Sequence, residues 1–369
     1  MRIAFDAKRA FLNHTGLGNY SRSVIEVLNA RQNAEELILC TPENPNTFPE
    51  LASMSKEVIV PETSLHKAFS SLWRSWFVTS QLRKRRIDLF HGLSNELPFG
   101  LKKSGIRSVV TVHDLIFLRY PSYYNMLDRL IYRFKTKKAC IDADRIVAIS
   151  AQTKTDIVSF FGVNPDKIDV VYQTCHDQFK QPVTENRKEE VRTKYGLKDS
   201  FILSVGTIEK RKNLLAVVNA ISEIDEIQLV VVGKKTDYFN EVELQVKKLG
   251  LESRVNFLHT VDFADLPAIY QQASMLVYPS EYEGFGIPIL EGLYSSIPVV
   301  TTKGGCFEEA GGDAASYVEF GDSAGLKKAI KNILNDSSLS ASMTEKGIRH
   351  SKSFSNESLA QGLTETYQR

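Results

Sequence analysis

The chain has 369 residues, of which 43% are hydrophobic and 24% are charged, and its formal net charge is +2. That length is too great for one ordinary core and favours two domains, and the composition is that of a soluble globular protein. No apolar run approaches the roughly 20 residues of a membrane-spanning helix, and the near-neutral charge argues against nucleic-acid binding.

Short β-branched runs alternate with longer helical patterns, which is typical of parallel sheets built from βαβ units. In the first half, the expected strands are Arg2–Asp6, Leu37–Thr41, Asp88–His91, Ser108–His113, Arg145–Ile149 and Ile168–Tyr172. In the second half, they are Phe201–Gly206, Gln228–Gly233, Val255–Leu258, Met275–Pro279 and Pro298–Thr301. A polar stretch over residues 173–186 separates the halves, so we expect domains at residues 1–175 and 186–355. We predict an α/β protein of two Rossmann-like, doubly wound domains that face a cleft, with ligands at the carboxyl ends of the strands.

The cysteines and the first residues predict a reducing, intracellular setting. Cys40, Cys140, Cys175 and Cys306 are too widely separated for a paired metal site or a dense disulfide framework. The segment Met1–Asp6 has the pattern of a charged strand and not of a secretory signal. We therefore expect a cytoplasmic protein.

A glycine pattern follows the first expected strand. Gly16 and Gly18 open a sequence similar to G-x-G-x-x-G, in which Ser21 replaces the last glycine before a helical pattern begins. The long insert after Asp6 departs from the nicotinamide-binding fingerprint, in which the turn lies tight against its strand. A turn without a ligand explains this segment as well as a phosphate site does.

Large apolar residues recur at helical spacing just before the basic run 83–86. These residues are Phe69, Leu72, Trp73, Trp76 and Phe77. One interpretation is an amphipathic helix whose apolar stripe packs on the core. The other is reversible docking on an anionic membrane, because residues 1–175 carry 24 Lys and Arg against 17 Asp and Glu.

His113 stands at the end of an expected strand, where open α/β sheets bind their ligands. By itself, such a histidine is better explained by a hydrogen bond to a neighbouring loop, and Asp114 beside it by orientation of that loop. Asp142 and Asp144 form a D-x-D pattern, which binds metals in some enzymes. They lie where a helix gives way to a strand, so helix-end charge and packing explain them better, and no metal site is predicted.

A strand that ends at Gly206 leads into three consecutive cations and then into a helix. Fixed cations such as Arg211 and Lys212 can stabilise the negative charge that develops on a departing phosphate, without a metal ion. An ordinary charged loop is the alternative interpretation.

The most informative segment follows the expected strand Met275–Pro279. It contains Glu283, Gly284, Phe285, Gly286, Pro288 and Glu291. The glycines allow the backbone to come close to a ligand, and the proline suits the first turn of a helix, whose N–H groups favour a phosphate. The two carboxylates can accept hydrogen bonds from hydroxyl groups. An anion site beside two hydroxyl acceptors predicts a sugar nucleotide as the ligand.

These segments resemble the retaining GT-B glycosyltransferases of glycosyltransferase family four, also called group 1. The run E-G-F-G-x-P-x-x-x-E is similar to the nucleotide-sugar motif of that family, and Ser204–Leu214 is similar to its V-G-x-x-E-x-R-K-N segment. The His-Asp-Leu run at residue 113 matches a third motif. The resemblance implies a GT-B fold in which the last helix, about residues 356–369, packs back on the first domain. One departure is Thr207, where many relatives carry arginine.

The resemblance also implies roles for individual residues. The glycine segment lies beneath the donor diphosphate, and the backbone carbonyl of His113 supports the positive charge that develops on the transferred sugar. Arg211 and Lys212 bind the diphosphate, Glu283 the sugar hydroxyls and Glu291 the ribose. The donor-binding residues are then Gly16, Gly18, Gly206, Arg211, Lys212, Glu283, Gly284, Phe285, Gly286 and Glu291. The catalytic residues are His113, Arg211, Lys212 and Glu283.

The implied reaction is a transfer in which the leaving group and the acceptor share one face of the sugar, and the leaving phosphate takes the acceptor's proton. Similarity to bacterial mannosyltransferases favours mannose from GDP-mannose as the hexose donor, with a UDP-sugar as the alternative. The acceptor is a polysaccharide or a lipid-linked glycan, and neither a metal nor another cofactor is expected. The basic first domain is the part expected to make peripheral contact with the inner face of the cytoplasmic membrane.

Two other functions are open. A hydrolase would use Glu283 and Glu291 as its carboxylate pair, but on one helix they would lie ~12 Å apart, beyond the roughly 5–9.5 Å of hydrolase pairs. A non-catalytic nucleotide-sugar sensor or assembly subunit would keep Glu291 and the Gly-Phe-Gly turn. Such a sensor would not need His113 or Lys212, so their presence favours an enzyme.

Overall fold

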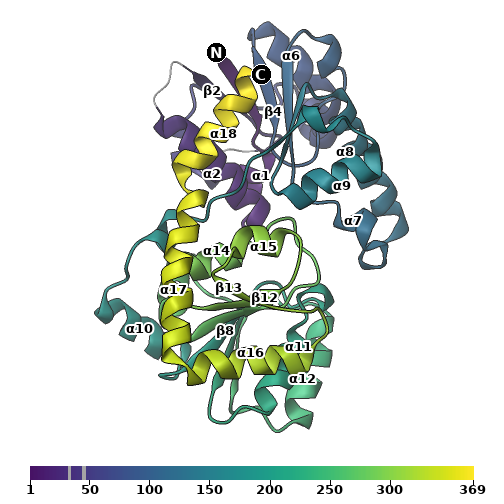
Figure 1. Ribbon diagram of the computed structural model, residues 1–369. Helices are drawn as coiled ribbons and strands as arrows, with labels where there is room; N and C mark the ends of the chain where they lie inside the picture. Colours follow the sequence, from purple (N-terminus) through teal and green to yellow (C-terminus); the bar gives the residue numbers. More distant parts are fainter. Residues whose placement is uncertain (32–34, 44–46) are drawn as a thin grey trace. The chain divides into compact units, whose positions relative to one another are not determined.

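The computed structural model describes residues 1–31, 35–43 and 47–369, which form two compact units. Unit 1 comprises Met1–Thr174 and Phe354–Arg369, and unit 2 comprises Cys175–Ser353. Each unit contains one parallel sheet with helices packed against it (Figure 1). This architecture confirms the predicted α/β class with two Rossmann-like domains.

The sheet of unit 1 has seven parallel strands in the order β3-β2-β1-β4-β5-β6-β7. Its strands are β1 (Arg2–Asp6), β2 (Glu36–Cys40), β3 (Glu57–Ile59), β4 (Leu89–Gly92), β5 (Arg107–Val112), β6 (Arg145–Ala148) and β7 (Ile168–Val170). Its helices are α1 (Lys8–Leu12), α2 (Gly16–Ala30), α3 (Pro49–Ser53), α4 (Ser64–Ala68), α5 (Ser70–Leu72), the π-helical turn η2 (Trp73–Phe77), α6 (Val78–Lys84), α7 (Ile116–Arg119), α8 (Met126–Asp142), α9 (Ala151–Phe161) and α18 (Asn356–Gln368). Strand β1 is fully buried at Ile3, Ala4 and Phe5, as expected for a central parallel strand covered on both faces.

The sheet of unit 2 has six parallel strands in the order β10-β9-β8-β11-β12-β13. Its strands are β8 (Phe201–Val205), β9 (Gln228–Val232), β10 (Val255–Leu258), β11 (Met275–Tyr278), β12 (Val299–Thr302) and β13 (Ala315–Val318). Its helices are α10 (Glu185–Tyr195), α11 (Leu214–Ser222), α12 (Tyr238–Lys248), α13 (Leu266–Tyr270), α14 (Ile287–Tyr294), α15 (Cys306–Gly311), α16 (Ser323–Asn335) and α17 (Ser337–Ser351). Among the helices of the described residues, none is long and apolar enough to cross a membrane.

Every strand expected from the sequence is present, with ends that differ by at most two residues. The sequence analysis missed β3 and β13. Both are short edge strands in which a single residue is buried, Ile59 in β3 and Val318 in β13. An edge strand needs less apolar surface than a central one, so its sequence carries little periodic signal.

Helix α18 ends the chain but belongs to unit 1, where it lies beside α2 (Figure 1). The hydroxyl of Tyr367 hydrogen-bonds Nδ1 of His91 at 2.7 Å, and its carbonyl accepts a bond of 2.8 Å from Nη1 of Arg107. Nη1 of Arg31, from the chain just after α2, donates to the hydroxyl of Thr364 at 2.8 Å. These bonds attach the helix to β4, β5 and α2.

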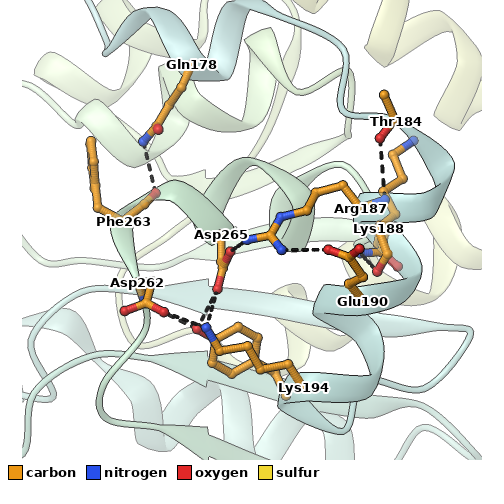
Figure 2. A network of polar contacts seen from close by, with 11 residues as sticks. Gln178, Thr184, Arg187, Lys188, Glu190, Lys194, Asp262, Phe263 and Asp265 are labelled. Atoms are coloured by element: carbon orange, nitrogen blue, oxygen red, sulfur yellow. Dashed lines mark hydrogen bonds and ion pairs between the residues drawn. The ribbon is translucent and has the colours of Figure 1, made fainter.

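A network of polar contacts attaches the first helix of unit 2 to the rest of that unit (Figure 2). The carboxylate of Asp265, which is fully buried, pairs with Arg187 of α10 and accepts bonds of 2.8 Å from Lys194 and from the hydroxyl of Tyr195. Burial raises the pKa of Asp265, but the bonds from Lys194 and Tyr195 outweigh it, so its pKa lies below the ordinary value. Residues 175–184, which lead into α10, are attached to the rest of unit 2 as well, since Gln178 donates to the carbonyl of Phe263.

We predict that Asp265→Asn lowers the free energy of unfolding by roughly 1–3 kcal/mol, because a carboxylate that holds three donors is lost. The matched control is Asp262→Asn, which removes another carboxylate partner of Lys194. The side chain of Asp262 is 69% exposed, so this substitution should lower the free energy of unfolding by less than about 1 kcal/mol. Since the pKa of Asp265 is depressed, the difference from wild type should be full at neutral pH and fade below about pH 4. Urea denaturation measures both variants, and equal losses would contradict this role for Asp265.

Candidate active site

Two glycines shape the loop that follows β8. Gly206 has a φ of 139°, a backbone conformation that strains an L side chain. A Cβ at Gly233, after β9, would lie 1.9 Å from the carbonyl oxygen of Gly206, so the two loops pass in direct contact. A Cβ at Gly206 would lie 3.4 Å from Cε of Lys212. Gly233 therefore permits the crossing of the loops, and Gly206 permits the path of the Lys212 side chain.

Arg211 and Lys212 lie on the short turn η7 (Lys210–Lys212), and both side chains reach Glu283 in the loop after β11. Nη1 of Arg211 lies 2.6 Å from Oε1 of Glu283, and Nζ of Lys212 pairs with the same oxygen. Lys212 also donates to the hydroxyl of Tyr278 at 2.6 Å, and that hydroxyl donates to Glu283 at 2.9 Å. A backbone bond of 2.8 Å from the N–H of Glu281 to the carbonyl of Arg211 joins the two loops.

The charges in this cluster are nearly withdrawn from solvent, since Arg211, Lys212 and Glu283 are 15%, 17% and 13% exposed. Burial raises the pKa of Glu283, but Lys212 and Arg211 outweigh it and hold its pKa at about 2. Burial lowers the pKa of Lys212, and Arg211 lowers it further, although Glu283 acts against both. Arg211 also pairs with Glu209 at 2.6 Å, a side chain that is 37% exposed, so the two cations meet one largely buried and one partly exposed carboxylate. Cations fixed in this way can be shared by a further anion.

The turn after Glu283 leads directly into α14. Phe285 is buried, and Gly286 has a φ of 111° at the N-cap of the helix, where Pro288 occupies the first turn. A Cβ at Gly286 would lie 3.1 Å from Cδ1 of Ile289, so both the backbone conformation and the space favour glycine. The thiol of Cys306 donates to the carbonyl of Glu283 at 3.2 Å and holds the turn from the side of α15.

Glu291 lies on α14, beyond the turn of residues 283–286. The hydroxyl of Tyr270, a fully buried residue of α13, donates to its Oε2 at 2.6 Å. Burial raises the pKa of Glu291 to about 7, and the bond from Tyr270 only partly opposes that rise. The carboxyl therefore changes its charge close to neutral pH, which the sequence did not predict.

His113 follows β5 in unit 1 and is held on several sides. Its N–H donates to Oδ1 of Asn95 at 2.9 Å, its Nε2 donates to the carbonyl of Leu93 at 2.8 Å, and its own carbonyl accepts from the hydroxyl of Thr153 at 3.2 Å. The ring of Tyr20 meets the imidazole edge to face with centroids 4.7 Å apart. Burial lowers the pKa of His113 to about 4, so the ring is neutral at pH 7.

A chain of buried hydrogen bonds runs from α18 toward His113. Nδ1 of His91 hydrogen-bonds the hydroxyl of Tyr367, and its Nε2 bonds the hydroxyl of Thr111 at 2.9 Å. Thr111 in turn bonds the hydroxyl of Tyr20 at 3.0 Å, and the ring of Tyr20 rests on His113. Burial lowers the pKa of His91 to about 3, so this chain is uncharged at neutral pH.

The predicted glycine loop is ordered as the start of a helix. Gly16 and Gly18 are the first and third residues of α2, and α1 occupies the insert before them. A Cβ at Gly18 would lie 1.7 Å from the carbonyl oxygen of Asn13, whose side chain accepts the N–H of Gly18 at 3.2 Å. Gly16 is exposed, with open space around its Cβ position. Packing thus explains Gly18, whereas the structure gives Gly16 no such role.

The D-x-D pattern makes structural contacts. Asp142 pairs with Lys138 one turn earlier in α8, and Asp144 accepts bonds from the N–H and the hydroxyl of Ser108 at 2.8 and 2.9 Å. Among residues 1–31, 35–43 and 47–369, no group of three or more His, Cys, Asp or Glu side chains has the geometry of a metal site.

A second charged cluster, which the sequence analysis missed, lies at the carboxyl end of β1. Asp6 accepts bonds of 3.1 and 2.9 Å from Nε of Arg74, and Nη1 of Arg74 pairs with Glu96 at 2.6 Å. Lys135 of α8 contacts the same Glu96 at 3.5 Å. The π-helical turn η2 thereby connects to the edge of the sheet where open α/β folds bind ligands.

The structure thus brings together Gly206, Arg211, Lys212 and Glu283, with Glu291 on the helix that follows, all in unit 2. His113, Gly16 and Gly18 belong to unit 1. Tyr278 and Tyr270 were missed, although Tyr278 ends the strand that delivers Glu283 and could have been found from that position. Nothing in the local sequence of Tyr270 signals its contact with Glu291.

Two family models match the chain in succession. Residues 15–176 match the model described as Glycosyltransferase Family 4, and residues 187–350 match the model described as Glycosyl transferases group 1. The O-antigen chain mannosyltransferase RfbU of Salmonella typhimurium is 28% identical over 87% of this chain and 88% of its own length. The O-antigen chain mannosyltransferase B of Escherichia coli is 27% identical over 96% of each chain.

The fold is also that of solved glycosyltransferases. Anabaena Alr3699/HepE, crystallised in complex with UDP and glucose, superposes with a TM-score of 0.78 at 18% identity, over 100% of this chain and 99% of that one. WaaG, a glycosyltransferase involved in lipopolysaccharide biosynthesis, gives a TM-score of 0.71 at 18% identity over 98% of both chains. The chain therefore belongs to the group 1, family four glycosyltransferases and has their GT-B fold.

Proposed function

We propose that this enzyme transfers mannose from GDP-mannose to a glycan or lipid-linked glycan, with retention of the anomeric configuration and without a metal ion. The cluster of Arg211, Lys212 and Glu283 carries the proposal, because it concentrates two buried cations where a strand end meets the start of a helix. The names of the mannosyltransferase relatives support the choice of sugar and of acceptor.

The proposed reaction exchanges one bond at the anomeric carbon for another. The bond from C1 to the β-phosphate oxygen breaks, and the acceptor oxygen bonds to C1 on the same face. The acceptor's proton passes to the departing phosphate, and the nucleoside diphosphate leaves. Arg211 and Lys212 stabilise the negative charge that gathers on the diphosphate as the bond opens, so the cations carry out the function for which other enzymes use a metal.

The carboxylates have binding roles in this proposal. Glu283 is bound by two cations, and its depressed pKa makes it a weak nucleophile and a weak base. We assign it to sugar hydroxyls and Glu291 to the ribose, with Gly284, Phe285 and Gly286 forming the turn that admits the phosphates. In unit 1 we assign His113 to the transferred sugar through its backbone carbonyl, which can accept a second hydrogen bond besides that of Thr153.

We predict that Lys212→Ala lowers kcat by about 10²- to 10³-fold, because one of the two groups that stabilise the leaving diphosphate is lost. Lys210→Ala is the matched control, since Lys210 lies on the same turn but is exposed. Steady-state transfer assays with both variants, each checked for an unchanged melting temperature, test the role. Unchanged transfer by Lys212→Ala would contradict the account of leaving-group stabilisation.

Donor affinity should depend on pH through Glu291. Its pKa of about 7 makes the carboxyl largely protonated at pH 6 and largely ionised at pH 8, and the ionised form accepts hydrogen bonds from ribose hydroxyls more strongly. Titration calorimetry should therefore show tighter donor binding as pH rises from 6 to 8. Tyr270→Phe should move the midpoint upward, because it removes a bond to the ionised form, and Glu291→Gln should abolish the dependence. A wild-type profile that is flat across this range would refute the assignment.

The donor itself is tested by thermal shift. GDP-mannose should raise the melting temperature more than UDP-glucose at equal concentration, because a ligand that binds only the folded state stabilises it by about 2.7 kcal/mol at 100 times its dissociation constant. GDP without the sugar is the control for the nucleotide contribution. A larger shift with UDP and its sugars would assign the alternative donor class.

A further inference from the structure

Unit 1 exposes large apolar side chains on two elements, the π-helical turn η2 with the residues before it and the helix α8. Six of these side chains are more than half exposed: Phe69, Trp76, Met126, Leu127, Leu130 and Phe134. Trp73 is the residue of the 69–77 stripe that is buried, at 1% exposure. The interpretation of this stripe as a core-facing helix is therefore wrong, because the π-helical turn rotates most of its large side chains outward.

Ring contacts join the two elements into one surface. Trp76 of η2 stacks on Phe99 with centroids 4.3 Å apart, and Phe99 meets Phe134 of α8 at 6.5 Å. The N–H of Phe99 donates to the carbonyl of Ser75 at 2.7 Å, which fixes the loop before β5 to the π-helical turn. We call the surface formed by Trp76, Phe99, Leu130, Phe134 and Ile141 the α8 face.

Basic side chains are interleaved with these apolar ones. Arg133, Lys137 and Lys138 line an open hollow of about 480 Å³ together with Leu130, Phe134 and Ile141. Nζ of Lys138 lies 5.6 Å from the ring centroid of Phe99. The helix carries five Lys and Arg against two acidic residues, Asp128 and Asp142, and Asp142 is paired with Lys138.

The positive charge of the α8 face favours an anionic lipid bilayer over a second copy of the chain as its binding partner. Two copies of the chain that met through this face would bring their Arg and Lys side chains together, and lysine is depleted in the cores of protein interfaces. An anionic bilayer accepts both components, because aromatic and aliphatic groups enter the interface while basic groups meet lipid headgroups.

The α8 face lies near the strand ends of unit 1 that carry His113. Helix α8 belongs to the crossover between β5, which His113 follows, and β6, so it begins on the side of the carboxyl ends of the strands. Arg74, two residues before Trp76, binds Asp6 at the end of β1. The α8 face therefore adjoins the edge of the sheet that carries the predicted site residue of this unit.

We propose that the α8 face docks the enzyme on an anionic lipid surface and presents that edge of unit 1 to the membrane. The proposal rests on the function proposed above, in that a lipid-linked acceptor would be held at the same surface.

Sedimentation with lipid vesicles tests the proposal. The wild-type protein should bind vesicles of phosphatidylcholine with about 30% phosphatidylglycerol, and bind much less to phosphatidylcholine alone. Leu130→Ser/Phe134→Ser should lower the partition coefficient at least about tenfold. Arg133→Gln and Lys137→Gln should each lower it roughly fivefold at low salt. Leu244→Ser, which alters an equally apolar side chain 69% exposed in unit 2, is the matched control and should change nothing.

Three results would overturn the proposal. One is wild-type protein that stays in the supernatant with anionic vesicles, and another is equal binding by Leu130→Ser/Phe134→Ser. The third is a concentration-dependent dimer in sedimentation velocity that the same variant dissolves, which would assign the face to a second copy. Transfer to a short water-soluble acceptor should be unchanged in the variant. A wild-type enzyme that binds vesicles but transfers no sugar to any acceptor would instead defeat the proposed function and leave the docking surface intact.

Discussion

The pairing of Arg211 and Lys212 with one carboxylate oxygen of Glu283 is the constraint on which the site in unit 2 depends. Buried cations are stable only with a partner, and this pairing draws the loop after β8 onto the loop after β11. The glycines at 206, 233 and 286 then follow as requirements of space, because the loops cross and the turn must enter α14 in a left-handed conformation. In the proposed function a diphosphate binds these same cations, which their carboxylate partners already hold in place, and fixed charges are the condition for electrostatic stabilisation of a leaving group.

The buried histidines of unit 1 are uncharged, in contrast to the ionised cluster of unit 2. His113 and His91 are buried and neutral, and their nitrogens are directed by hydrogen bonds to Leu93, Thr111 and Tyr367. The neutral imidazole of His113, fixed in this way, holds the backbone of its own residue in place. It does not supply a charge or a mobile proton. Because Tyr367 belongs to α18, the last helix of the chain helps to hold the strand ends of this unit.

Much of this architecture could be predicted from the sequence, because buried parallel strands are continuous apolar runs and the charged motifs fall at their ends. Edge strands β3 and β13 carried too little apolar pattern. Residues 69–77 have helical spacing, but most of their large side chains are exposed, including two of the three in the π-helical turn. Arg211, Lys212 and Glu283 were found from their motifs. Tyr278 could have been placed from its position at the end of β11, but the bond from Tyr270 to Glu291 and the close approach of Gly18 to Asn13 are tertiary contacts that no local spacing reveals.

The most direct test of the central claim is a crystal structure of the enzyme with the nucleoside diphosphate product of its donor. The account predicts oxygens of the diphosphate at about 2.7–2.9 Å from the guanidinium of Arg211 and the ammonium of Lys212, with the ribose beside Glu291. A diphosphate bound elsewhere, with both cations still paired only with the protein's own carboxylates, would contradict it.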